Sequence, residues 1–167
     1  MKTQKQNPSL GVQFFLLLIF LILSFPIFSA VRTYFDPGNG TVKDTVTGLV
    51  WQKCSAGQTN NASCTGTAST MNWKSALAYC DGLTLGGRSD WRLPNVKELL
   101  TLVNPLKSSP AIDTAVFPAT VSSVYWSSSP DVSYPTYAWI VYFLSGFVTS
   151  TNMTSIYQVR CVAGGLN

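Results

Sequence analysis

Short β-prone stretches of apolar and polar residues, separated by turn residues, occur in both halves of the chain. Near the N-terminal side, residues 41–43 and 49–53 are β-prone segments on either side of a turn, which predicts a hairpin or meander. The C-terminal half contains more segments of this kind, at residues 124–129, 137–143, 147–151 and 157–164. They predict three or four antiparallel strands.

Two segments show the period of an amphipathic helix instead. In the first, Trp73, Ala76, Leu77 and Cys80 recur at helical spacing, Asn72 is placed as the N-cap and Gly82 lies near the end. In the second, Asn95 and Glu98 form a capping box directly after Pro94, and an apolar stripe follows at Val96, Leu99, Leu100 and Val103. Strands, two short helices and then strands predict an α+β fold in which the helices pack on antiparallel sheet.

The N-terminal region has a different pattern. Lys2 and Lys5 precede an apolar run from Val12 to Phe28, and Ser29 and Ala30 follow it. A basic start, an apolar run and small residues predict a signal peptide over residues 1–30, with an uncleaved N-terminal membrane anchor as the alternative. Residues 31–167 then form one exported domain, located in the periplasm, on the outer surface or in the medium.

Charge excludes one class of partner. Without Lys2 and Lys5 the chain has nine basic and seven acidic residues, a net charge of +2. So small an excess, with no run of basic residues, does not predict nucleic-acid binding. Membrane contact is expected only through the N-terminal segment, if that segment is not cleaved.

Four cysteines, Cys54, Cys64, Cys80 and Cys161, agree with an oxidising compartment. They allow three disulfide pairings, of which we favour Cys54 with Cys64 and Cys80 with Cys161. A zinc site is the competing interpretation. It is disfavoured because the chain has no histidine and no C-x-x-C spacing.

The sequence does not predict an enzyme, a cofactor or a metal site. With no histidine and a single glutamate, Glu98, there is no ordinary general base for a serine or cysteine nucleophile. Calcium needs several oxygen ligands with carboxylates among them, and the seven acidic residues are scattered along the chain.

Six ordered motifs resemble one bacterial family, the Lcl C-terminal domain family, named for a collagen-like adhesin. They are NGTVKDTVTGLVWQK, WKSALAYC, LTLGGRSDWRLPNVKEL, YWSSS, AWIVYFLSG and VRCV, within residues 36–163. The resemblance implies adhesion and recognition of sulfated glycans. The family's collagen-like stalk has no counterpart here, because the chain has no Gly-X-Y repeat.

The segment WRLPNVKEL is also similar to a segment of C-type-lectin-like folds. In such folds a cysteine of the first helix pairs with one of the last strand, which implies the pairing of Cys80 with Cys161. The resemblance therefore implies a C-type-lectin-like domain closed by this disulfide.

Three loops are expected to form a ligand-binding face: residues 55–70, the loop around Arg88, and residues 129–137. Arg88, Tyr134 and Tyr137 are the candidate ligand contacts. Trp91, Arg92, Pro94, Asn95 and Glu98 are interpreted as structural, with Arg92 buried and paired with Asp90 or with backbone carbonyls. Most of the five tryptophans, Trp51, Trp73, Trp91, Trp126 and Trp139, are expected in the core.

The function expected from these features is that of an exported envelope module for binding or adhesion, which recognises sulfated or anionic glycans without calcium. The alternative is a structural or protein-interaction module of the envelope with an envelope protein as partner and no sugar ligand. Arg88 and Arg92 offer guanidinium groups that suit sulfate or carboxylate, which is the functional alternative for both residues.

Overall fold

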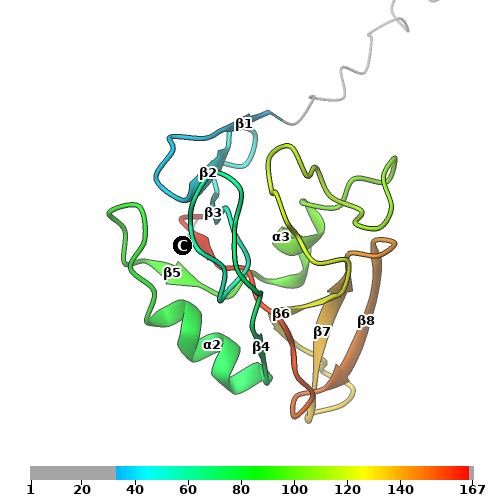
Figure 1. The fold of residues 1–167 in the computed structure, drawn as a ribbon. Helices are drawn as coiled ribbons and strands as arrows, with labels where there is room; N and C mark the ends of the chain where they lie inside the picture. The colour runs from blue at the N-terminus through cyan, green and yellow to red at the C-terminus, as the bar shows by residue number, and fades with distance from the viewer. Residues whose placement is uncertain (1–32, 166–167) are drawn as a thin grey trace, which may run out of the picture. The chain divides into compact units, whose positions relative to one another are not determined.

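The computed structural model describes residues 33–165, so the predicted signal peptide or anchor lies outside the described residues. The described chain contains two helices and two five-stranded sheets, and the predicted α+β class is confirmed (Figure 1). Neither of its helices is long and apolar enough to cross a membrane.

The first sheet brings the beginning and the end of the described chain together (Figure 1). Its order is β1–β2–β3–β10–β5, and all neighbours are antiparallel. Val162 of the last strand pairs with Trp51 on one side and with Arg92 on the other. The strands are β1 (Tyr34–Phe35), β2 (Thr41–Asp44), β3 (Val50–Gln52), β5 (Trp91–Arg92) and β10 (Val162–Ala163).

The second sheet has the order β4–β9–β6–β7–β8. It departs from the purely antiparallel arrangement expected, because β6 and β9 pair in parallel through Tyr125 and Gln158. Such a pair needs a long connection, which here contains the antiparallel strands β7 and β8. The strands are β4 (Thr70–Met71), β6 (Val124–Pro130), β7 (Tyr137–Tyr142), β8 (Phe147–Asn152) and β9 (Tyr157–Gln158).

Both helices begin at the predicted residues. In α2 (Trp73–Asp81) the side chain of Asn72 accepts the Ser75 N–H, and Gly82 is the C-cap. In α3 (Val96–Leu100) the predicted capping box is present. This helix ends before Val103, which the apolar stripe had included, because Val103 instead forms a β-bridge with Ile112.

Residues 157–164 do not form the single strand that the sequence predicts. They form β9 in the second sheet and β10 in the first, separated by residues 159–161. The first sheet and the loop after β3 hold this linking segment: Gln52 N–H of β3 donates to the Cys161 carbonyl, and Ala56 N–H of the loop donates to the Val159 carbonyl. The chain therefore passes between the sheets here instead of extending one of them.

Buried side chains form two apolar groups. One contains Trp51, and the other contains Trp91 and Trp126, so three of the five tryptophans are fully in the core, while Trp73 and Trp139 are partly buried. The second group also holds the disulfide between Cys80 of α2 and Cys161, both fully buried. Together with the disulfide between Cys54 and Cys64, this confirms the favoured pairing.

Candidate functional site

Arg88 lies in a tight hairpin after α2. Leu85 and Arg88 form a β-bridge across Gly86 and Gly87, both with positive φ (+60° and +75°), a conformation that glycine adopts at little cost. The Arg88 guanidinium donates two hydrogen bonds to the Asp90 carboxylate, and this pairing lowers the pKa of Asp90. A ligand anion at Arg88 would compete with a carboxylate that is already in place.

Arg92 differs from its predicted environment in two respects. It is half-buried, with 41% of its side chain exposed, and its carboxylate partner is Glu98, since Asp90 is paired with Arg88. Both terminal nitrogens of Arg92 donate to Glu98 oxygens at 2.7 Å, and Nη2 also donates to the Gly164 carbonyl at 2.9 Å. The predicted structural role through a backbone carbonyl is thus present, but the predicted pairing with Asp90 is wrong.

The Glu98 carboxylate joins this ion pair to the start of α3. It accepts the Asn95 N–H at 2.8 Å while the Asn95 side chain accepts the Glu98 N–H at 2.9 Å. Burial raises the pKa of Glu98, but the hydrogen bonds from Arg92 and Asn95 outweigh burial and leave the pKa below its usual value. Pro94, buried just before the cap, accepts the Ser128 N–H through its carbonyl and so ties α3 to β6.

A pocket of about 570 Å³ opens beside this ion pair, between α2 and the segment that leads into α3. Its volume lies in the usual range for small-molecule sites. Leu77, Ala78 and Leu93 form its apolar lining, and its polar lining comes from Lys74, Asp81, Arg92, Asn95 and Ser128. Cationic and anionic groups both line the pocket, so it does not select strongly for an anion.

Tyr134, in the loop between β6 and β7, and the half-buried Tyr137, the first residue of β7, form an aromatic pair. Their ring centroids are 5.5 Å apart with the ring planes inclined by 46°, and Tyr134 is 60% exposed. Sequence reasoning selected both residues and the structure brings them together.

Asp131 at the base of the loop holds the loop in place. Its carboxylate accepts the Ser133 N–H at 2.9 Å and the Ser150 hydroxyl of β8 at 2.6 Å, and these two bonds lower its pKa. The Asp131 N–H donates to the Tyr137 carbonyl, which closes the loop. The aromatic pair is therefore presented on a hydrogen-bonded turn instead of a free chain.

The three predicted loops do not form one face. Gly40 lies between the first two, because a Cβ on Gly40 would be 2.8 Å from Asn60 Cβ and 3.1 Å from Leu85 Cδ1. The loop 129–137 lies at the opposite end of the domain from the Arg88 hairpin in Figure 1. Arg88 therefore cannot share a compact ligand with Tyr134 and Tyr137.

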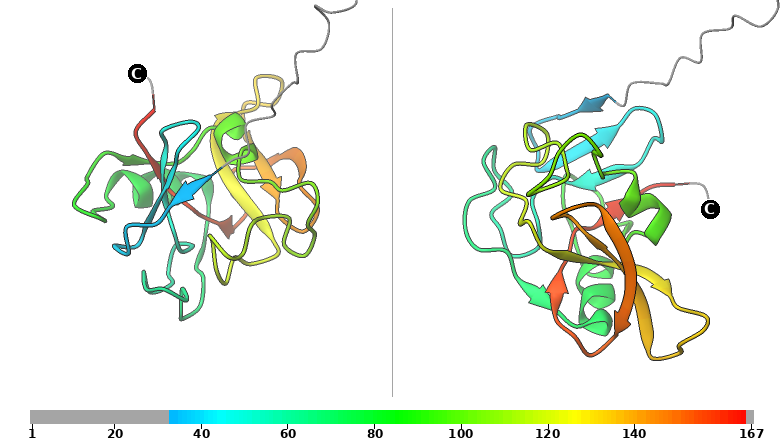
Figure 2. Two further views of the ribbon diagram at one scale, coloured as in Figure 1. Left: turned by 90° about the horizontal axis from the view of Figure 1, so that it is seen from above. Right: turned by 90° about the vertical axis from the view of Figure 1, so that its right-hand side faces the viewer.

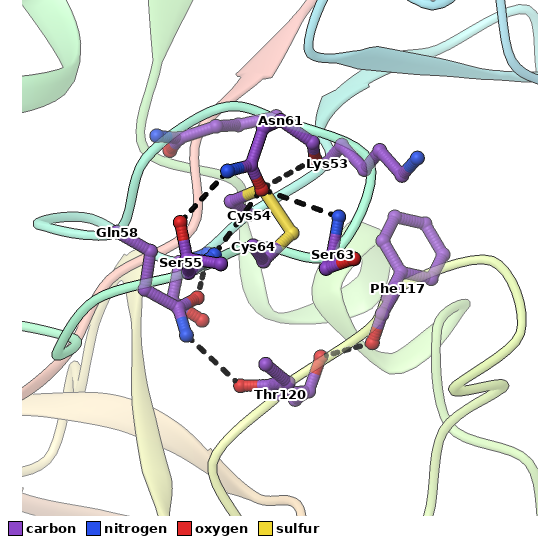
Figure 3. Close-up of a disulfide and its surroundings, with 12 residues drawn as sticks. Lys53, Cys54, Ser55, Gln58, Asn61, Ser63, Cys64, Phe117 and Thr120 are labelled. Carbon is purple, nitrogen blue, oxygen red and sulfur yellow. Dashed lines mark hydrogen bonds between the residues drawn. A yellow bond between two sulfur atoms is a disulfide. The ribbon is translucent and has the colours of Figure 1, made fainter.

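The loop that begins at Cys54 is less superficial than expected. Ser55, Ala56 and Gln58 are buried, and Gln58 extends toward the segment that holds Phe117 and Thr120, where its amide donates to the Ala119 carbonyl (Figure 3). Beyond Gln58 the loop is exposed up to the buried Cys64, and the Asn61 side chain accepts the Ser63 and Thr65 N–H groups. The first half of the loop belongs to the core and only the second half faces solvent.

Arg160 is the residue that sequence reasoning missed. Its side chain is fully buried, and it donates to the carbonyls of Gln52 and Lys53 and to the hydroxyls of Ser55 and Thr120. Burial lowers its pKa, and its guanidinium carbon lies 4.8 Å from the centre of the Phe117 ring. The signal available in the sequence was a single arginine inside an otherwise apolar segment next to Cys161.

The basic residues of the described chain do not gather into a free patch. Lys53, Lys107, Arg88 and Arg92 each pair with an acidic residue, and Arg160 is buried. Within residues 33–165 this leaves Lys43, Lys74 and Lys97 without an ion pair, on β2, α2 and α3 respectively. No group of three or more histidine, cysteine or acidic side chains in that range is arranged to hold a metal ion.

Comparison with known proteins gives a match to a family model. The model of the family described as the Lcl C-terminal domain matches residues 40–163, which contain the Arg88 hairpin, the pocket and the tyrosine loop. No curated protein matches the chain.

Proposed function

Because the chain belongs to the Lcl C-terminal domain family, we propose that it is an exported envelope module for binding or adhesion that recognises glycans without calcium. The observation that carries this proposal is the aromatic pair of the exposed Tyr134 and the half-buried Tyr137 on a hydrogen-bonded loop. Aromatic faces combine large apolar area with few rotatable bonds, so they bind the apolar face of a sugar ring at low entropic cost.

The tyrosine loop is remote from the start of the described chain. That chain begins at β1, at the opposite end of the domain from residues 129–137 (Figures 1 and 2). Two disulfides support an oxidising location in the periplasm, on the outer surface or in the medium.

Electrostatic attraction is a secondary contribution in this proposal. Most of the cationic side chains are paired or buried, and Lys74 shares its pocket with Asp81. An anionic or sulfated glycan would therefore gain little from long-range attraction, and salt would weaken its binding only modestly. Arg88 would contact such a glycan only at a site separate from the tyrosine loop.

We further propose that the fold is C-type-lectin-like. The disulfide from Cys80, in the first described helix, to Cys161, next to the last strand, agrees with this relationship. No enzyme activity or cofactor is included in the proposal, because the chain lacks histidine and its only glutamate is engaged by Arg92 and Asn95.

The alternative function is a structural or protein-interaction module of the envelope. It is favoured by Val132 and Ile156, which are 94% and 63% exposed. Their loops are joined where Met153 N–H donates to the Thr136 carbonyl. Aliphatic side chains beside tyrosines suit a protein surface better than a hydrophilic polysaccharide.

A glycan array with the exported chain tests the proposal, at low and high salt and with and without calcium. We expect calcium-independent binding that Tyr134→Ala and Tyr137→Ala each reduce about tenfold, the loss expected when about 1.4 kcal/mol of contact energy is removed. Phe35→Ala is the matched control, since Phe35 is 60% exposed and lies on β1, away from both the tyrosine loop and β8. Binding that depends on Arg88 but not on the tyrosines, or no binding at all, would reject this site.

A further inference from the structure

The outer edge of β8 differs from the other sheet edges in its length. The two sheets end on β1, β5, β4 and β8, and the first three are two residues long each. Natural edge strands are commonly this short, which leaves few unpaired backbone groups for another chain. β8 spans six residues, Phe147–Asn152, and offers a full row of such groups.

β8 also lacks the other features that protect an edge strand. It contains no charged residue and no proline, and its register with β7 continues through six residue pairs without a bulge. Among the described helices and strands, β7 is the one that packs extensively against it. Figure 2 (right) looks onto β8 on the outside of the domain, with no other element over it.

The two faces of β8 have different surroundings. On the inner face, Val148 packs against the core and the Ser150 hydroxyl donates to Asp131. On the outer face, Phe147 is 61% exposed and Thr149 is exposed as well. A strand added at this edge would therefore continue a sheet that has one packed face and one solvent face.

We propose that a second copy of this chain pairs with β8 in antiparallel orientation, so that two five-stranded sheets become continuous. A two-fold axis at Thr149 places Thr149 opposite Thr149 of the second copy, and Phe147 opposite Thr151 of the second copy. Threonine–threonine and aromatic–β-branched pairs are favourable across strands. The strand has no charge, so self-pairing brings no like charges together.

A pairing of this size is weak in free solution. One six-residue strand pair buries less than the roughly 1,200 Å² of a stable specific interface. Two copies held on the same surface would associate more strongly, because tethering raises their effective concentration. This inference does not depend on the glycan proposal, because it is argued from the unpaired edge of β8 alone, although Ser150 of β8 also binds Asp131 of the tyrosine loop.

Sedimentation velocity over a wide range of concentration tests the proposal with the exported chain, its disulfides intact. We expect a monomer–dimer equilibrium that Thr149→Lys shifts toward monomer, with the dissociation constant raised about tenfold or more by two facing lysines. Ser145→Lys adds the same charge in the exposed turn before β8 and is expected to leave the equilibrium unchanged. Circular dichroism establishes that both variants are folded.

A cross-linking measurement tests the register itself. Thr149→Cys places two thiols opposite each other in the proposed dimer, so mild oxidation is expected to give a covalent dimer. Thr154→Cys, in the exposed loop after β8, is the control and is expected to stay monomeric. A dimer that survives Thr149→Lys overturns the proposal. A chain that is monomeric at every concentration also overturns it, and this includes the outcome in which β8 binds another envelope protein instead of a second copy.

Discussion

Three arginines of this domain lie in three different environments. Arg160 is fully buried and held by two carbonyls and two hydroxyls, Arg92 is half-buried in an ion pair with Glu98, and Arg88 is paired with Asp90 near the surface. Removing a buried donor leaves its partners unsatisfied, whereas removing an exposed one exposes them to water. The cost of substitution should therefore follow burial and not formal charge.

Arg160→Met is expected to lower the free energy of unfolding by about 3 kcal/mol or more, because it leaves the buried carbonyls of Gln52 and Lys53 without these donors. The same change at the exposed pair, Arg88→Met, is expected to cost at most about 1 kcal/mol. Urea denaturation monitored by tryptophan fluorescence measures both. Equal costs would mean that the Arg160 contacts contribute nothing beyond a surface ion pair.

Glu98→Gln is expected to change the pH dependence of stability. The folded-state pKa of Glu98 lies below its ordinary value of 4.5, so its contribution is fully present above that pH and is lost as the pH falls through the folded-state pKa. Thermal unfolding from neutral pH to well below 4.5 should therefore show a shallower acid loss in the variant. Asp36, Asp90, Asp113 and Asp131 also have lowered pKa values and remain in both proteins, so parallel curves would remove Glu98 as a contributor.

At the scale of elements, most helices and longer strands follow from local pattern, and their connections do not. The caps at Asn72 and Asn95 and the strands β6, β7 and β8 lie where periodicity and capping residues predict them. The two-residue strands β1, β4 and β5 were not predicted, because so short a segment has no period to detect. They exist as strands only because a neighbour pairs with them.

The two disulfides link cysteines that are 10 and 81 residues apart in the sequence. Loop entropy predicts contributions of about 3 and about 4.5 kcal/mol respectively. We expect Cys80→Ala with Cys161→Ala to destabilise the domain more than Cys54→Ala with Cys64→Ala, since the longer loop also joins α2 to the C-terminal segment. Urea denaturation of the two double variants compares them, and a larger loss from the shorter loop would contradict this order.

At the scale of the whole molecule, the domain presents two candidate surfaces that adjoin where Tyr137 pairs with Asn152 of β8. The tyrosine loop is at one end, and the β8 edge runs along an outer side (Figure 2). Binding at the first surface and self-pairing at the second would combine in a tethered module, because two linked sites bind a repeating ligand more tightly than one.

The two surfaces are expected to be separable by mutation. Tyr134→Ala should weaken glycan binding and leave self-association unchanged, whereas Thr149→Lys should remove self-association and lower apparent affinity only for a ligand that is immobilised at high density. Binding to a dense and to a sparse glycan surface measures this difference. If both variants lose binding to the sparse surface, the two surfaces are not independent.

The sequence predicts many of the residues of the site but not how they are arranged in space. Tyr134 and Tyr137 were selected because they lie in a loop rich in turn residues, and Asn95 and Glu98 because a capping box has a fixed spacing. The partner of Arg92 was assigned by proximity in sequence to Asp90. In the structure the first turn of α3 brings Glu98 to Arg92, and Asp90 pairs with Arg88 instead.

The sequence by itself determined the class of fold, the two helix starts and the family, because caps, periodicity and ordered motifs are local properties of the chain. It left the disulfide pairing as one of three, and the structure confirmed the favoured one. Only the tertiary structure decided that residues 157–164 pass between two sheets, that Arg160 is buried, and that the predicted loops lie at two ends of the domain. These features depend on residues far apart in sequence meeting in space, and no local pattern encodes such a meeting.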